Sequence, residues 1–172
     1  MWSPDDGANS GPATTAALQP VMGVPATILP DQYEILATRV VRGAGLVIEH
    51  PRVLERSEPD DPSADYTVRL TTKLRTAGSG TTLLLECRRN TQPIPAEALD
   101  ALADRFRDFR VIVFATGGYD TGALARASTL GMVLYRVVDA KADYEGWGYT
   151  GQAPAWLPEF TAERVAGPEL SG

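Results

Sequence analysis

The stretch Leu83–Arg89, with the sequence LLLECRR, constrains the fold of this chain more than any other. Three consecutive leucines are typical of a strand that is buried on both faces, and charged residues follow them at once. Because side chains alternate along a strand, Glu86 and Arg88 share one face while Cys87 and Arg89 point to the other. An acid and a cation at the end of an apolar strand need solvent, a metal or a ligand as a partner. This end of the strand is therefore a candidate site.

A second acid lies at the start of the preceding strand-like segment. In Tyr66–Leu74 apolar and polar residues alternate, which predicts a half-buried strand. The Gly-containing segment 77–80 then predicts a turn into the leucine strand. If the two strands form an antiparallel hairpin, Asp65 returns beside Glu86 and Arg88. The sequence thus predicts two carboxylates and a cation at one end of a sheet.

Helical and strand periodicities alternate through the middle of the chain, which predicts the order αβββαβαβ. Strands joined by a helix should be parallel, so the expected architecture is an α/β fold with a mixed β-sheet flanked by helices. Besides the hairpin, we expect a helix from Asp31 with Asp31 and Glu34 as a capping box, a strand at Leu46–Ile48 resuming at Val53–Leu54, a helix at Ala96–Phe109, a strand at Val111–Ala115, a helix at Thr121–Leu130 and a strand at Met132–Val138.

Composition divides the chain into three parts. Residues 1–30 are rich in Gly, Ala, Pro, Ser and Thr and are expected to form a disordered N-terminal arm. Residues 31–140 should form the folded domain, and residues 141–172 an aromatic C-terminal extension that packs on the domain or on a partner. The domain has 14 Lys and Arg residues against 15 Asp and Glu residues, a net charge of −1. Any phosphate binding must therefore be local, because no basic run is present.

Residue counts exclude several kinds of site. Cys87 is the only cysteine and His50 the only histidine, which excludes an internal disulfide, a cysteine zinc site and a paired-histidine metal site. No apolar run approaches the length of a membrane span, and the N-terminus lacks a signal-peptide pattern. We expect a cytoplasmic protein that does not associate with membranes.

Taken together, the order and the motifs resemble the restriction-endonuclease-like nucleases with the PD-(D/E)xK motif, particularly the Mrr-type branch. The resemblance extends from about Asp31 to Asp139 and leaves out both ends of the chain. The matching segments are Gly43–Val47, Asp65–Val68, Leu83–Arg88, the connector Pro93–Pro95, Val113–Tyr119, and Ala123, Ala127, Gly131 and Leu134.

This resemblance implies a restriction-endonuclease-like core and a metal site. Asp65 and Glu86 would bind Mg²⁺, with Mn²⁺ as a substitute, and the backbone carbonyl of Cys87 would lie near the ion. Glu34 takes the position of the family's first-helix acid. Arg88 stands where the family has lysine, and a guanidinium does not lose its proton. Arg88 would therefore hold the scissile phosphate as a fixed positive charge.

The expected function is a Mg²⁺-dependent DNA endonuclease in defence or DNA processing, acting on DNA as a possible homodimer or within a larger defence complex. Two alternatives stay open. The first is a catalytically degenerate relative that binds nucleic acid or a protein partner. The second is a structural module that docks into a larger complex through the aromatic extension.

Overall fold

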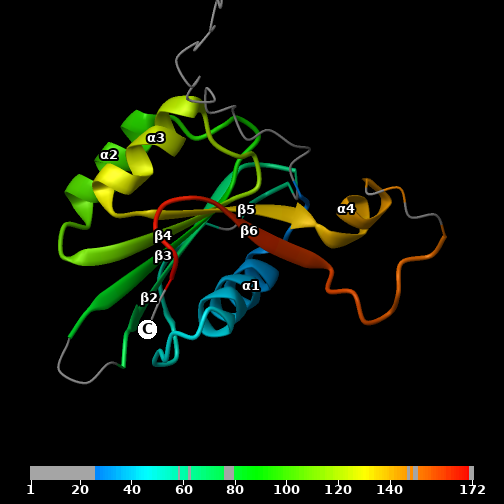
Figure 1. Cartoon of the computed structure of the whole chain (residues 1–172), viewed down its shortest axis with the longest axis horizontal. Coiled ribbons are helices and arrows are strands. Elements are labelled where there is room, and N and C mark those ends of the chain that lie inside the picture. The colour runs from blue at the N-terminus through cyan, green and yellow to red at the C-terminus, as the bar shows by residue number, and fades with distance from the viewer. Residues whose placement is uncertain are drawn as a thin grey trace, which may run out of the picture.

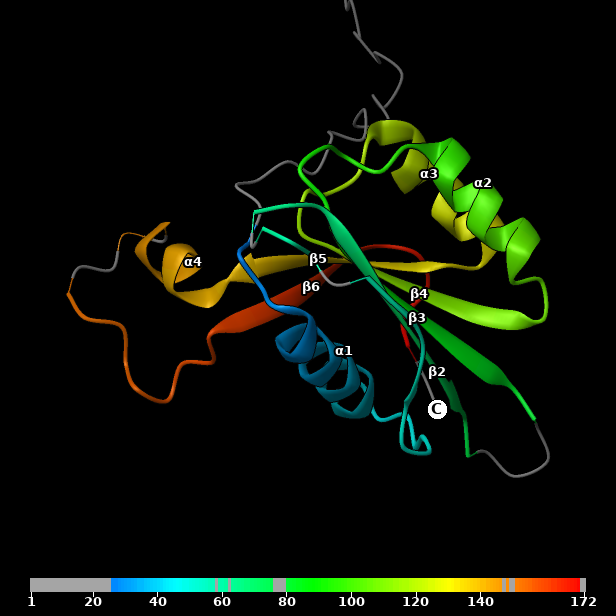
Figure 2. The same cartoon turned by 180° about the vertical axis from the view of Figure 1, so that it is seen from behind.

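The computed structural model describes residues 26–57, 59–61, 63–75, 80–146, 148 and 151–170. In this part of the chain, helices pack on both faces of one six-stranded mixed sheet with the strand order β1-β2-β3-β4-β5-β6 (Figures 1 and 2). The α/β class expected from the sequence is confirmed. The finer prediction of a nuclease core stays a prediction. The expected disordered arm spans residues 1–30, of which residues 1–25 lie outside the described part of the chain. For residues 26–30 the expectation is wrong, because Ala26 and Ile28 are buried in the core and Pro30 begins the first helix.

Three antiparallel strands form one half of the sheet. They are β1 (Arg52–Arg56), β2 (Tyr66–Lys73) and β3 (Thr82–Arg89). The hairpin of β2 and β3 is the predicted one, and its register places Arg69 directly across from Glu86. β1 is an edge strand, and a bulge between Val53 and Glu55 interrupts its pairing with β2.

The other half of the sheet adds parallel pairs and one more antiparallel strand. β4 (Phe109–Ala115) runs parallel to β3, and β5 (Val133–Asp139) runs parallel to β4. β6 (Phe160–Ala166) pairs antiparallel with β5. β6 comes from the aromatic extension, where the sequence predicted no strand. Its Phe160 side chain is buried in the core, so this part of the extension packs on the domain.

The helices divide between the two faces of the sheet. α1 (Pro30–Gly43) covers the face that carries Leu85 and Cys87, whereas α2 (Ala96–Arg105) and α3 (Thr121–Leu130) cover the face that carries Leu84 (Figure 1). Burial of their apolar stripes, at about 25 cal/mol per Å² of apolar surface, supplies the main stabilisation of both layers. α4 (Ala140–Gly146) follows β5 at the side of the molecule. None of the helices described has the length and apolar character needed to cross a membrane.

Two local predictions at the start of the domain are wrong. The first strand is Arg52–Arg56, which contains the expected Val53–Leu54. The expected start at Leu46–Ile48 is wrong, because Ile48 makes only an isolated bridge to Leu74 and the proline that follows His50 separates the two segments. The first helix begins at Pro30, and the Gln32 side chain accepts a hydrogen bond from the Leu29 amide at 2.9 Å. The expected capping box of Asp31 and Glu34 is therefore absent. Proline suits the first helical turn because its missing N–H has no partner there.

The third helix matches its prediction at both ends. The Asp120 carboxylate accepts a hydrogen bond from the Ala123 amide at 2.8 Å and so caps the N-terminus. Gly131, with a φ of 68°, ends the helix in the left-handed conformation that glycine adopts readily. α2 ends at Arg105, earlier than predicted, because the chain turns at Phe106 and enters β4 at Phe109.

The ends of β3 and β4 approach each other too closely for a side chain at Gly117. A Cβ atom at this position would lie 2.2 Å from the Asn90 carbonyl oxygen. The Gly117 amide instead donates to the Asn90 side-chain oxygen at 3.0 Å, and the Asn90 amide donates to the Thr116 hydroxyl at 3.0 Å. This contact fixes the chain just beyond Arg88.

We expect Gly117→Ala to destabilise the protein by about 1–3 kcal/mol, because the backbone of Asn90 must move to admit the methyl group. Chemical denaturation followed by circular dichroism measures this loss. Gly43→Ala is the matched control, since a Cβ at Gly43 meets nothing within 4 Å. The control should be neutral or slightly stabilising. Equal stability of the two variants would contradict the close approach.

Candidate functional site

A fully buried carboxylate lies at the centre of the candidate site. The Glu86 side chain has 0% of its surface exposed. Its Oε2 accepts a hydrogen bond from Arg69 Nε at 2.6 Å, and its Oε1 accepts from Arg69 Nη2 and Arg88 Nε, both at 3.0 Å. The contact with Arg69 is bidentate, the geometry in which a guanidinium binds a carboxylate most strongly. Two cations therefore neutralise one buried anion.

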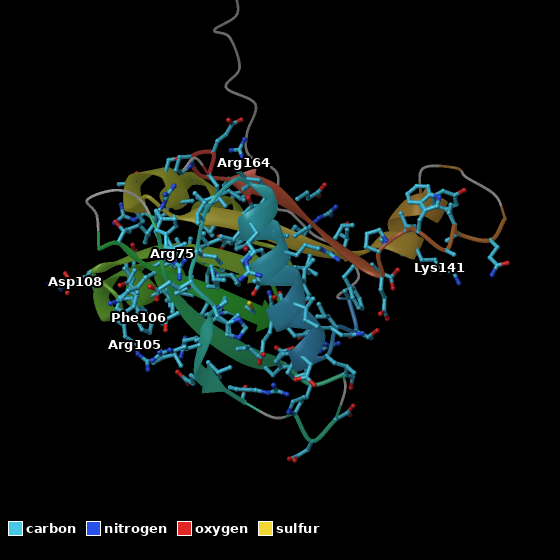
Figure 3. The ribbon with its side chains drawn as sticks, turned by 90° about the horizontal axis from the view of Figure 1, so that it is seen from below. Arg75, Arg105, Phe106, Asp108, Lys141 and Arg164 are labelled. Carbon is cyan, nitrogen blue, oxygen red and sulfur yellow. The ribbon has the colours of Figure 1, made fainter. Side chains whose placement is uncertain are left out.

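Arg69 extends this network to the edge of the sheet. Its Nη1 donates to Glu55 on β1, and Arg105 approaches the same carboxylate at 3.4 Å. Both guanidiniums lie near the Phe106 ring, at 5.8 Å for Arg69 and 5.1 Å for Arg105, and Figure 3 shows Arg105 and Phe106 beside each other. Burial alone would lower the pKa of Arg69, but its bonds to Glu86 and Glu55 raise it. Arg69 thus stays charged and links β1, β2 and β3.

Arg88 is fixed through both its side chain and its backbone. Its carbonyl oxygen accepts hydrogen bonds from the Tyr33 hydroxyl at 2.8 Å and from the Thr116 amide at 3.1 Å. Burial raises the pKa of Tyr33 well above its usual value, so its hydroxyl remains a donor. The Arg88 side chain is 25% exposed, unlike that of Glu86. A positioned guanidinium therefore reaches solvent from a rigid strand.

Asp65 has partners of its own. Its Oδ1 accepts from the Thr91 amide at 3.0 Å, and its Oδ2 lies 3.4 Å from the Thr91 hydroxyl. Arg89 Nη1 approaches Asp65 at 3.8 Å. Glu86 pairs with Arg69, and Asp65 precedes Arg69 by four residues on the same side of the hairpin. At the rise of a β-strand, this separates the positions of Asp65 and Glu86 by roughly 13 Å. The two acids therefore contact different groups.

Asp65 and Arg88 nevertheless line one hollow at the end of the hairpin. The hollow opens where β2 begins and β3 ends, and the side chains around it are polar apart from one aromatic ring. Its lining residues are Ser57, Asp65, Tyr66, Thr67, Arg88, Arg89 and Asn90. The structure thus brings together one acid and the cation of the predicted set, whereas Glu86 lies behind them and is closed off from solvent.

Glu34 lies on the other side of the sheet from Glu86. It is part of α1, which packs against the face that carries Cys87. Its carboxylate accepts a hydrogen bond from Arg56 Nη1 at 3.0 Å, and the same nitrogen binds Asp31 at 2.7 Å. The structure therefore does not bring Glu34 to the carboxylate of Glu86.

Cys87 is a core residue. Its side chain is fully buried, and β3 has strands on both sides at this position, with Val68 and Phe114 as neighbours. Burial, followed by the negative charges of Glu86 and Glu34, raises the pKa of the thiol well above its usual value. The thiol therefore stays protonated at neutral pH and is not a nucleophile.

This arrangement does not fit a Mg²⁺ ion shared by Asp65 and Glu86. Mg²⁺ requires free carboxylate oxygens in an octahedral arrangement, and three of about four acceptor positions on Glu86 are already taken by N–H groups. The two cations beside Glu86 also repel a third. Within the described ranges, no cluster of three or more metal-ligating side chains is present. The magnesium site stays a prediction from the resemblance.

Sequence reasoning missed three residues of this site. The position of Arg69 could have been found from the predicted hairpin. If Tyr66 pairs with the last residue of β3, Arg89, then Arg69 lies directly opposite Glu86. The sequence gives no indication of the role of Tyr33 beyond its position on the apolar side of the helix, since its hydrogen bond to Arg88 joins residues far apart in the chain. Asn90 follows the strand directly, and its contact with Gly117 depends on the parallel pairing of β3 with β4.

Comparison of the chain with protein-family models, curated proteins and solved structures finds no match.

We expect Glu86→Gln to reduce the free energy of unfolding by about 3–5 kcal/mol, because it leaves the largely buried Arg69 and the neighbouring Arg88 without their shared anion. The double variant Arg69→Met/Glu86→Leu should recover much of this loss, since an apolar pair needs no neutralisation. Urea denaturation measures all variants.

Asp104→Asn is the control, because the Asp104–Arg107 pair is exposed and should change the stability by less than about 1 kcal/mol. If Glu86→Gln were no more harmful than this surface change, the buried network would not stabilise the fold.

Proposed function

We propose that this chain is a nuclease-like α/β module that binds the phosphodiester backbone of DNA without cutting it, with Arg88 as the phosphate ligand. The observation that supports this proposal is the state of Glu86, whose carboxylate accepts three N–H bonds from Arg69 and Arg88. In this state the carboxylate orients a guanidinium and has little capacity left to bind a metal.

The hollow at the end of the hairpin suits a phosphate group. Arg88 presents a planar set of N–H donors whose Nε is already fixed by Glu86, so little side-chain freedom is lost on binding. Two small polar residues, Ser57 and Thr67, line the same hollow. The acid at its rim, Asp65, is bound to Thr91 and faces Arg89. Phosphate binding would therefore be local, as the net charge of −6 requires.

Fluorescence anisotropy with labelled duplex and single-stranded DNA tests this proposal over a range of salt concentrations. We expect weak binding that falls with salt, and we expect Arg88→Gln to lower the affinity and reduce the salt slope by about one. Arg107→Gln, in the exposed turn that follows α2, is the matched control and should bind as the wild type does. Loss of affinity in both variants alike, or no binding to any DNA, would overturn the proposal.

A Mg²⁺-dependent DNA endonuclease is the second candidate. One observation favours it, namely that Asp65 and Arg88 line the same hollow on the end of the hairpin where the resemblance places the nuclease site. Under this proposal Glu86 has to leave Arg69 before it can take part.

A cleavage assay with Mg²⁺ and Mn²⁺ on modified and unmodified DNA separates the two functions. We expect no cleavage by the wild-type protein under the binding proposal. Cleavage that Asp65→Asn and Glu86→Gln abolish would establish the endonuclease instead. In that case Arg88→Ala should lose roughly two to three orders of magnitude in rate, and Arg88→Lys should keep or raise it. A circular-dichroism spectrum of each variant controls for unfolding.

A further inference from the structure

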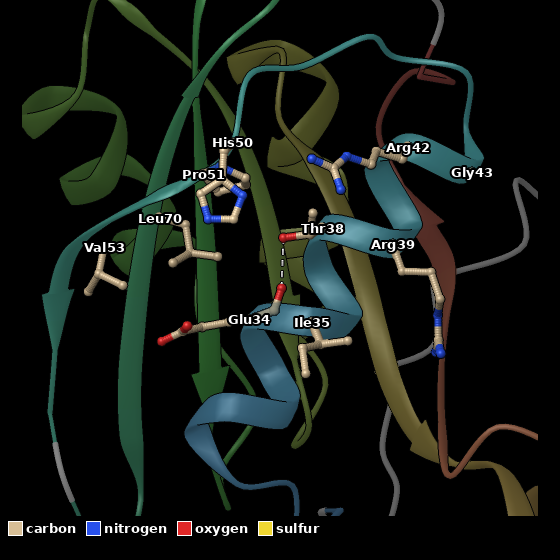
Figure 4. Close-up of a pocket in the computed structure, with 10 residues that line it drawn as sticks. All are labelled: Glu34, Ile35, Thr38, Arg39, Arg42, Gly43, His50, Pro51, Val53 and Leu70. Carbon is tan, nitrogen blue, oxygen red and sulfur yellow. Dashed lines mark hydrogen bonds between the residues drawn. The ribbon is translucent and has the colours of Figure 1, made fainter.

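An apolar groove lies between α1 and the first two strands, and none of its lining residues lines the hairpin hollow. Its volume is about 710 Å³, within the range of small-molecule sites. Leu70 forms part of its floor, and Ile35 and Val53 line its sides (Figure 4). The side chains of Ile35 and Val53 are large and apolar, yet Ile35 is 65% exposed and Val53 is 51% exposed. Such exposure at one place indicates a surface that a ligand covers.

The two ends of the groove differ in charge. At one end the Arg42 guanidinium faces the His50 ring (Figure 4). Among the residues that the structure describes, neither side chain makes a hydrogen bond or an ion pair. At the other end Glu34 is already paired with Arg56. The groove therefore has an uncompensated positive charge at one end only.

The neighbouring charges do not cancel that of Arg42. Arg39 turns away and donates to the Phe160 carbonyl oxygen at 2.8 Å. Glu49, which precedes His50, lines a neighbouring hollow to which His50 also contributes, and there the cations Arg52 and Lys73 accompany it. An anionic group beside Arg42 would therefore find a cation with no competing partner.

The shape of the groove favours a small molecule over a protein segment. Arg42 and Glu34 lie eight residues apart on α1, so the apolar part is roughly 12 Å long and ends at a polar group on both sides. Edge strand β1 carries a bulge and three charged residues, features that hinder the addition of another strand. A long peptide or a second copy of the sheet would thus meet an unsuitable edge.

We propose that this groove binds a small amphipathic acid, with its apolar body on Ile35, Val53 and Leu70 and its anionic head on Arg42 and His50. This site is independent of the DNA-binding function proposed above, since it shares no residue with the hairpin hollow. The ligand class is defined by its chemistry, an apolar chain or ring that carries a carboxylate or phosphate.

Three probes with the same tail and different heads test the proposal on the full chain, namely decanoate, decanol and decylammonium below their micelle concentrations. Isothermal titration calorimetry should rank their affinities in that order. Arg42→Gln should weaken decanoate about tenfold, the scale of one hydrogen bond to a charged group, and leave decanol unchanged. Ile35→Ser should weaken all three probes. Arg107→Gln is the control, and its affinities for the three probes should equal those of the wild-type protein.

Three results would overturn the proposal: no binding of decanoate, equal binding of decanoate and decylammonium, or full affinity in Arg42→Gln. Analytical ultracentrifugation of the protein without probes measures its oligomeric state as a further test. A dimer that Ile35→Asp dissociates would assign the groove to a second copy of this chain and also overturn the proposal. Amide chemical shifts that move around α1 and β1 on adding decanoate, but not around the hairpin hollow, would support it.

Discussion

The structure depends on the neutralisation of a charge that lies inside the sheet. Glu86 sits on the central strand β3 with no exposed surface, where an unpaired carboxylate would be far less stable than in water. Arg69 and Arg88 remove this penalty by direct hydrogen bonds, and Arg69 carries the contact on to Glu55 at the sheet edge. A single ion network thus links three strands that apolar packing alone would hold less specifically.

The same network determines what the candidate site can do. Two guanidiniums provide around Glu86 the positive charge that a divalent ion provides in a metal site, but they cannot activate water as a bound ion does. Arg88 is the member that reaches solvent, and its backbone is held by Tyr33 from α1 and by Thr116, the residue that follows β4. The site is therefore suited to holding an anion in a fixed place. The apolar groove is built separately, from α1, β1 and Leu70 of β2.

Local sequence signals predicted the elements that local forces control. The third helix has an aspartate cap and a glycine stop, and both act within a few residues of the chain. The first helix and strand were placed less well, because the Gln32 contact replaced the expected cap and the proline at 51 moved the strand onward. β6 has no strong strand pattern and forms because the edge of β5 offers it a hydrogen-bonding partner.

The sequence by itself determined the α/β class, the β2–β3 hairpin and the face on which Glu86 and Arg88 lie, because alternation along a strand is a local property. Only the tertiary structure decided the partners. The register of the hairpin places Arg69 opposite Glu86. The turn after β3 brings the Thr91 amide within hydrogen-bonding distance of Asp65, and the packing of α1 places Glu34 on the other face of the sheet from Glu86. Which groups meet depends on distances between segments far apart in the chain, and alternation within one segment carries no information about those distances.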